Sequence, residues 1–171
     1  ITISTNPTSG GIWTSATIGS YITYTFTPNI NSATLNNTEL VNRLYGATGY
    51  TIGNVTISTA NPSGTESGSI TIASEIRTIN RSTIRYTLQI IAAGDMLING
   101  SFEMSASNSP LTANCNNLIL TAGGNISLIG RINLTPTSAY RDNTTLYSSS
   151  GDITINANGY VKVSNTINAD G

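Results

Sequence analysis

A repeated strand pattern is the feature that most constrains the fold of this chain. Four five-residue segments begin with Gly, continue with a short polar residue and then alternate apolar and small or polar side chains. They span residues 68–72, 94–98, 124–128 and 151–155, so their starts lie 26, 30 and 27 residues apart. Apolar residues at every second position indicate a strand with one buried face. Similar strands at a nearly fixed period indicate a repeat architecture.

Two further short strands accompany each of these segments. A second strand follows at residues 100–104, 130–134 and 159–163, with 75–77 as a shorter equivalent, and a third apolar strand precedes at 55–59, 88–91, 118–121 and, with a weaker pattern, 145–147. Three short strands cannot enclose a core alone, whereas stacked coils bury a continuous column of Ile, Leu and Val. We therefore predict an all-β fold, a parallel β-helix of about six coils. A β-sandwich is the alternative, although its strands need not resemble one another.

The alignment of the repeats also predicts which side chains stack. One internal column contains Ile70, Met96, Ile126 and Ile153. One outward row contains Arg77, Glu103, Asn133 and Lys162, with Arg77 and Glu103 placed for a cross-strand ion pair. Residues 1–10 resemble residues 55–64, and we expect them to belong to an earlier turn of the same repeat.

One segment, residues 37–45, carries helix signals instead of strand signals. Asn36 and Glu39 stand at the spacing of a capping box, and Gly46 provides a C-terminal stop. Leu40 and Leu44 fall on one helical face. We predict a short helix that lies against the side of the solenoid or covers the end of a coil.

The composition excludes many functions. The chain has no His and one Cys, Cys115, so the usual ligand sets for zinc, copper or iron and the common catalytic triads cannot be assembled. Seven basic and eight acidic residues give no electrostatic surface for nucleic acid. No apolar run reaches the length of about 18 residues that a membrane span requires. We expect no cofactor, no metal, no nucleic-acid partner and no membrane insertion.

An enzyme hypothesis can be tested against the repeat. Equivalent positions after the first Gly hold Ser69, Asp95, Asn125 and Asp152. If Asp95 and Asp152 lie two rungs apart, their Cα atoms are separated by about 9.6 Å, close to the carboxyl spacing of inverting glycosidases. Short polar residues after Gly are also ordinary turn formers. We expect no catalytic activity, with a polysaccharide-active β-helix enzyme as a remote alternative.

The order of several segments resembles a known family. Residues 39–44, a strand at 55–59, a Pro/Ser/Gly loop and the strand at 68–72 follow one another as in secreted adhesins of the filamentous-haemagglutinin type. Residues 118–132 are similar to the standard coil of those proteins, and the resemblance covers most of residues 35–171. It implies a right-handed parallel β-helix, exported by two-partner secretion and displayed as a rod on the surface of a prokaryotic cell.

These observations lead to a functional expectation. Residues 1–171 form a single β-helix domain, a segment of a longer repeat protein or a polymerising subunit. We expect a non-catalytic structural or adhesive segment of an extracellular filament, acting in cell adhesion or as a rigid stalk and facing a glycan or protein receptor. The alternative is a self-assembling filament or sheath subunit, joined to identical subunits or neighbouring coils at open coil ends. The candidate assembly edges are Ile1, Ile3, Val161, Val163 and Ile167.

Overall fold

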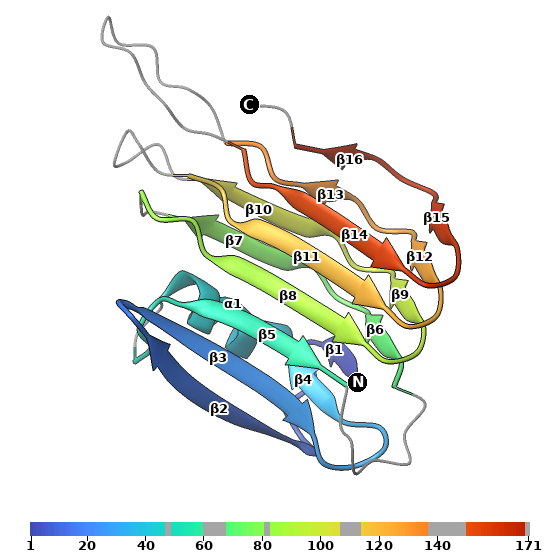
Figure 1. Cartoon of the computed structure of the whole chain (residues 1–171), viewed down its shortest axis with the longest axis horizontal. Helices are drawn as coiled ribbons and strands as arrows, with labels where there is room; N and C mark the ends of the chain where they lie inside the picture. Colours follow the sequence, from blue (N-terminus) through green and yellow to red (C-terminus); the bar gives the residue numbers. More distant parts are fainter. Residues whose placement is uncertain (47–48, 60–67, 81–82, 107–113, 137–149, 170–171) are drawn as a thin grey trace, which may run out of the picture.

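Three sheets enclose the core of the protein (Figure 1). The computed structural model describes residues 1–46, 49–59, 68–80, 83–106, 114–136 and 150–169. The strand expected at 145–147 lies outside the residues that the structure describes. Sheet A contains, in spatial order, β15 (Val161–Val163), β12 (Ile126–Leu128), β9 (Met96–Ile98), β6 (Ile70–Ile72), β1 (Thr2–Ser4) and β4 (Thr34–Asn36). Sheet B contains β14 (Ile153–Ala157), β11 (Asn117–Ala122), β8 (Thr87–Ala92), β5 (Asn54–Ser58), β3 (Tyr21–Pro28) and β2 (Gly11–Ile18). Sheet C contains β16 (Ile167–Asn168), β13 (Ile132–Asn133), β10 (Phe102–Ala106) and β7 (Ile76–Asn80).

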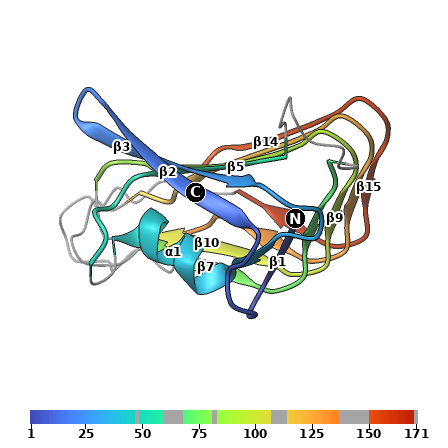
Figure 2. The same ribbon diagram turned by 90° about the horizontal axis from the view of Figure 1, so that it is seen from below.

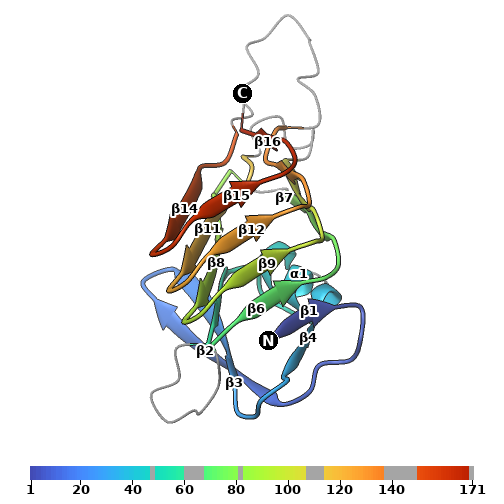
Figure 3. The same ribbon diagram turned by 90° about the vertical axis from the view of Figure 1, so that its right-hand side faces the viewer.

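The chain visits sheets B, A and C in the same order in each coil. The coils are β5–β6–β7, β8–β9–β10, β11–β12–β13 and β14–β15–β16, and every pairing between them is parallel. The prediction of a parallel β-helix is confirmed, with about four turns instead of six. The difference arises because residues 1–53 build a cap at the N-terminal end and no complete coil of their own (Figure 3).

Uniform register explains why the repeats resemble one another. Leu118 lies between Leu88 and Ile153, and Leu120 lies between Ile90 and Ile155, so like side chains stack along sheet B. The inward residues of the middle coils are completely buried. Burying each such Leu or Ile contributes about 1.5–3 kcal/mol. The need to place an apolar side chain at the same point of every coil explains the repeated strand pattern in the sequence.

The last coil corrects the predicted register. Ile153 begins β14 and pairs with Leu118 in sheet B, while Val161 takes the place beside Ile126 in sheet A. The N–H of Gly94 donates to the carbonyl of Gly68, and the N–H of Gly124 donates to the carbonyl of Gly94, each at 3.0 Å. Gly159 continues this series, because its N–H donates to the carbonyl of Gly124 (2.9 Å). Strand alternation alone could not separate these choices, since the segment at 151–155 fits either sheet.

The outward row changes with this register. Asn168 lies beside Asn133 in sheet C, whereas Lys162 lies beside Ser127 in sheet A. The predicted place of Lys162 next to Asn133 is therefore wrong. Arg77, Glu103 and Asn133 do share one row, as predicted.

The N-terminal segment differs most from the sequence-based expectation. Strand β1 joins sheet A between β6 and β4, although its sequence resembles β5 of sheet B. Strands β2 and β3 form an antiparallel hairpin at the end of sheet B, which the repeat pattern did not predict. A short run of alternating Ile, Thr and Ser fits a strand in any of the sheets. The similarity of β1 to β5 therefore could not show which sheet β1 joins.

The predicted helix is confirmed as α1 (Asn37–Tyr45). The Asn36 side chain accepts hydrogen bonds from the N–H groups of Thr38 and Glu39 (2.9 and 3.2 Å). Gly46 ends the helix in the left-handed region, at a φ of 73°, and its N–H bonds the carbonyl of Asn42. This conformation favours glycine because a Cβ would be strained there. Leu40 and Leu44 are buried, as the helical spacing predicts.

Candidate functional site at the ends of the solenoid

The protein closes most of its N-terminal end with its own chain. Helix α1 packs beside β7 and β5, where sheet C would otherwise continue (Figure 2). The outer side of β4 is also occupied. The N–H of Ser9 donates to the carbonyl of Thr34 and the N–H of Thr34 donates to the carbonyl of Ser9, each at 2.9 Å. Sheets A and C are therefore covered at this end.

A buried guanidinium fastens this cap. Arg43 is 8% exposed, and its guanidinium carbon lies 4.0 Å from the ring centroid of Trp13 and 4.5 Å from that of Tyr50. It donates a hydrogen bond to the carbonyl of Glu39 (2.9 Å). The Glu39 carboxylate lies 3.7 Å from the guanidinium and accepts a hydrogen bond from the Trp13 indole (3.3 Å). Trp13 packs edge-on against Phe26. These contacts join helix, hairpin and core.

Replacing Arg43 by Ala is expected to lower the free energy of unfolding by about 2 kcal/mol, through lost packing and lost cation–π contacts with Trp13, Tyr24 and Tyr50. Trp13 is the single tryptophan, so its fluorescence reports on the cap. We expect an emission shift to longer wavelength and a lower urea midpoint. Arg77→Ala, at an exposed position, is the matched control. Equal stability of both variants would contradict the fastening role.

The C-terminal coil is more exposed than the coils before it. Among the described residues, β14, β15 and β16 each pair on one side only. Val161, Val163 and Ile167 are 44%, 46% and 37% exposed, whereas their neighbours Ile126, Leu128 and Ile132 are buried. A hollow of about 610 Å³ opens at this end, lined by Gly151, Asp152, Ile153, Ile155, Ile167 and Ala169. The interior of the solenoid thus reaches the surface there.

The five predicted edge residues are not equivalent. Val161, Val163 and Ile167 lie in the outermost strands of sheets A and C. Ile1 and Ile3 do not form an edge, because β1 is paired on both sides and Ile3 is completely buried. That part of the assignment is corrected: residues 5–9 turn back and β4 pairs outside β1, so the start of the chain lies inside the sheet.

The acidic positions of the enzyme hypothesis lie in different surroundings. Asp95 accepts a hydrogen bond from the N–H of Asn125 (2.7 Å), and Asn125 in turn accepts one from the N–H of Tyr160 (3.1 Å). These side chains connect successive coils at one turn. Asp152 precedes β14 in sheet B and lies 3.6 Å from the guanidinium of Arg85. The predicted stacking of Asp95 and Asp152 two rungs apart is therefore wrong.

Asparagines at the starts of sheet B strands have a role that the sequence analysis missed. Asn54 accepts a hydrogen bond from the N–H of Thr87 (2.9 Å), and Asn117 accepts one from the N–H of Asp152 (3.0 Å). Buried Asn116 does the same for the N–H of Tyr86 (3.1 Å). The available signal was an Asn at the start of a sheet B strand, present at β5 (Asn54) and at β11 (Asn116 and Asn117). These bonds hold the turns of neighbouring coils in register.

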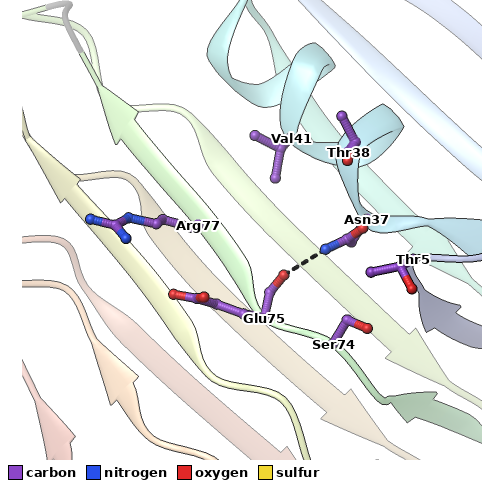
Figure 4. A pocket seen from close by; sticks show the side chains of 7 residues that line it. All are labelled: Thr5, Asn37, Thr38, Val41, Ser74, Glu75 and Arg77. Atoms are coloured by element: carbon purple, nitrogen blue, oxygen red, sulfur yellow. Dashed lines mark hydrogen bonds between the residues drawn. The ribbon is translucent and has the colours of Figure 1, made fainter.

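A groove of about 500 Å³ lies beside the cap (Figure 4). It is lined by Thr5, Asn37, Thr38, Val41, Ser74, Glu75 and Arg77. Asn37 donates a hydrogen bond to the carbonyl of Glu75 (2.8 Å) and so connects α1 to the turn before β7. Arg77 lies beside Glu103 in the sheet register, but the carboxylate of Glu103 bonds Arg131 (2.7 Å) and Asn133 (3.0 Å). The groove is thus part of the cap junction.

The described residues offer little reactive chemistry. They include no group of three or more His, Cys, Asp or Glu side chains that could hold a metal ion. Burial raises the pKa of the Cys115 thiol, while hydrogen bonding to the backbone of Ala106 and Gly151 opposes that shift. Within the same part of the chain, no helix has the length and apolarity needed to cross a membrane.

Comparison of the chain with protein-family models, with curated proteins and with solved structures gives no match.

Proposed function

We propose that the protein is a non-catalytic structural section of an extracellular surface filament. The regular solenoid acts as a stiff spacer, because each coil is bonded to the next along three sheets. In this role it holds adhesive surfaces away from the cell. A glycan or protein receptor binds the turns that face outward. The resemblance of residues 35–171 to secreted β-helical adhesins supports this proposal.

The observation that carries the proposal is the difference between the two ends. Helix α1 and residues 5–9 cover most of the N-terminal end, where Arg43 packs against the ring of Trp13. Among the described residues, the strands of the C-terminal coil are outermost in all three sheets; Val161, Val163 and Ile167 are exposed, and Ile167 also lines the hollow. Solenoid coils are stabilised mainly by their neighbours, and an uncovered apolar end is unfavourable. Such an end is suited to receive a further coil of the same kind.

An appended coil tests this proposal. A second copy of residues 81–106, joined after Gly171, supplies one more strand for each sheet. We expect the urea midpoint to rise and hydrogen exchange at the backbone amides of β14, β15 and β16 to slow, because the appended strands cover these three strands. The control carries Ser in place of Leu88 and Ile90 in the appended copy only. If the extended protein and its control have the same midpoint and the same amide exchange in β14, β15 and β16, the proposed extension at this end is wrong.

The same exposed coil supports a second candidate, a self-assembling filament or sheath subunit. Here the next coil comes from an identical subunit. The two candidates differ in whether copies of the unextended protein associate through the C-terminal coil, so that the mass grows with concentration by that route. Val163→Lys, in the outermost strand of sheet A, then blocks this growth, whereas Lys162→Ala does not.

A further inference from the structure

Strand β2 is an unprotected edge at the end that is otherwise closed. Among the described residues it pairs only with β3 and is the outermost strand of sheet B. It runs for eight residues and is exposed along most of its length. Natural proteins usually protect such edges with Lys, Pro or a bulge. Residues 11–18 contain neither Lys nor Pro, and the whole segment 1–38 carries no acidic or basic side chain.

The hydrogen bonding of the hairpin fixes which backbone groups face outward. The N–H of Asn29 donates to the carbonyl of Gly10 (2.9 Å), so this carbonyl points toward the β3 side. In a trans peptide the following N–H points the opposite way, and the direction alternates along a strand. The N–H and C=O groups of Trp13, Ser15 and Thr17 therefore point to the open side. The N–H and C=O groups of Ile12 and Ala16 point toward β3 and form hydrogen bonds with it.

This alternation restricts how a second copy can pair. In an antiparallel ladder, outward groups of one strand must face outward groups of the other. A two-fold axis at Ser15 satisfies this condition: it places Ser15 opposite Ser15 and Trp13 opposite Thr17 of the second copy. A register shifted by a single residue places outward groups opposite inward groups and forms no ladder.

The same register brings exposed apolar side chains together. It places Ile12 opposite Ile18 of the second copy, at a pair without hydrogen bonds, where side chains approach most closely. Ile12 is 55% and Ile18 is 68% exposed. Tyr21 lies opposite Ile18 within the hairpin and is 45% exposed. Two copies would thus cover apolar residues that are otherwise in water, with no like charges opposed.

We propose that β2 is the docking site for a second copy of this chain, which adds by antiparallel pairing of β2 with β2 about a two-fold axis at Ser15. The result is one continuous sheet B running through two solenoids joined at their N-terminal ends. A single strand pair buries less surface than a standard interface, so the dimer is weak and forms at high concentration. This association goes beyond the proposed function, since it uses the end opposite to the coil that is extended there.

Charge placed at the axis tests the pairing. Ser15→Lys and Ser15→Glu each oppose like charges in the dimer, whereas a mixture of the two opposes unlike charges. By sedimentation equilibrium, we expect the mean mass of the unchanged protein to rise toward twice its 17.9 kDa as concentration increases. Each variant alone stays at the monomer mass, and the equimolar mixture regains association. Trp13 fluorescence and far-UV circular dichroism verify that both variants are folded.

A cysteine at the axis provides a second measurement. Hydrogen-bonded antiparallel pairs have Cα atoms about 5.5 Å apart, within disulfide range. Ser15→Cys is therefore expected to form a covalent dimer under oxidation, while Thr23→Cys on β3 is not. An unchanged protein that stays monomeric at every concentration overturns the proposal. So does association that Ser15→Lys leaves intact, which assigns it to another surface such as the C-terminal coil.

Discussion

Replacing Ile126 by Asp is expected to unfold the solenoid. Ile126 is completely buried and lies between Met96 and Val161 in sheet A. The new carboxylate would have no partner in this apolar column, and its burial costs several kcal/mol in addition to the lost packing. We expect a loss of about 4 kcal/mol or more, a large part of the total stability of a domain. Urea unfolding followed by far-UV circular dichroism measures the effect.

The matched control for this prediction is Lys162→Ala. Lys162 is exposed in the strand that covers Ile126, and exposed substitutions of this kind usually change stability by less than about 0.5 kcal/mol. An Ile126→Asp protein with the midpoint of the control would mean that the column is open to water at this coil. The closed parallel solenoid described above would then be wrong.

The middle coils could be predicted from sequence because two signals agree there. Alternation marks the strands, and the first Gly of each coil marks the turn; Gly68, Gly94 and Gly124 are bonded in that order. In the last coil the signals conflict, since Gly151 and Gly159 both precede an alternating strand. Only the stacking of Gly159 on Gly124 resolves the register, and this stacking depends on the three-dimensional path of the chain.

The two ends were less predictable for a physical reason. Val161, Val163 and Ile167 were identified as edge residues because few charges surround them, and they do lie in outermost strands. Ile1 and Ile3 have the same character but lie inside sheet A, since pairing partners from distant sequence are not encoded in a local pattern.

The hairpin did have a local signal in the sequence. Gly19 and Ser20 separate two runs rich in Thr, Ile and aromatic residues, as in a two-residue hairpin turn, and Gly19 has a φ of 63°. This antiparallel element lies outside the repeat of 26 to 30 residues that predicts the parallel coils. Its outer strand β2 was consequently absent from the predicted edges.

Substituting Gly130 by Ala is expected to produce the second large loss of stability. A Cβ at this position would lie 2.1 Å from the carbonyl oxygen of Gly100 and 2.6 Å from its carbonyl carbon. Both atoms belong to the backbone of the neighbouring coil, so the conflict cannot be relieved by turning a side chain. The two coils must separate locally, which weakens the hydrogen bond from the Gly130 N–H to the carbonyl of Ile98 (3.0 Å). We expect a loss of about 3 kcal/mol.

Gly19→Ala separates this steric effect from the general effect of adding a methyl group. Nothing lies within 4 Å of the Cβ that this change adds, and the cost comes only from the positive φ of the turn. That cost is about 1–2 kcal/mol. Thermal and urea unfolding should therefore rank the unchanged protein above Gly19→Ala and Gly19→Ala above Gly130→Ala. The reverse order of the two variants would show that the coils have room for a side chain at Gly130, and that close backbone approach does not set the spacing of the stack there.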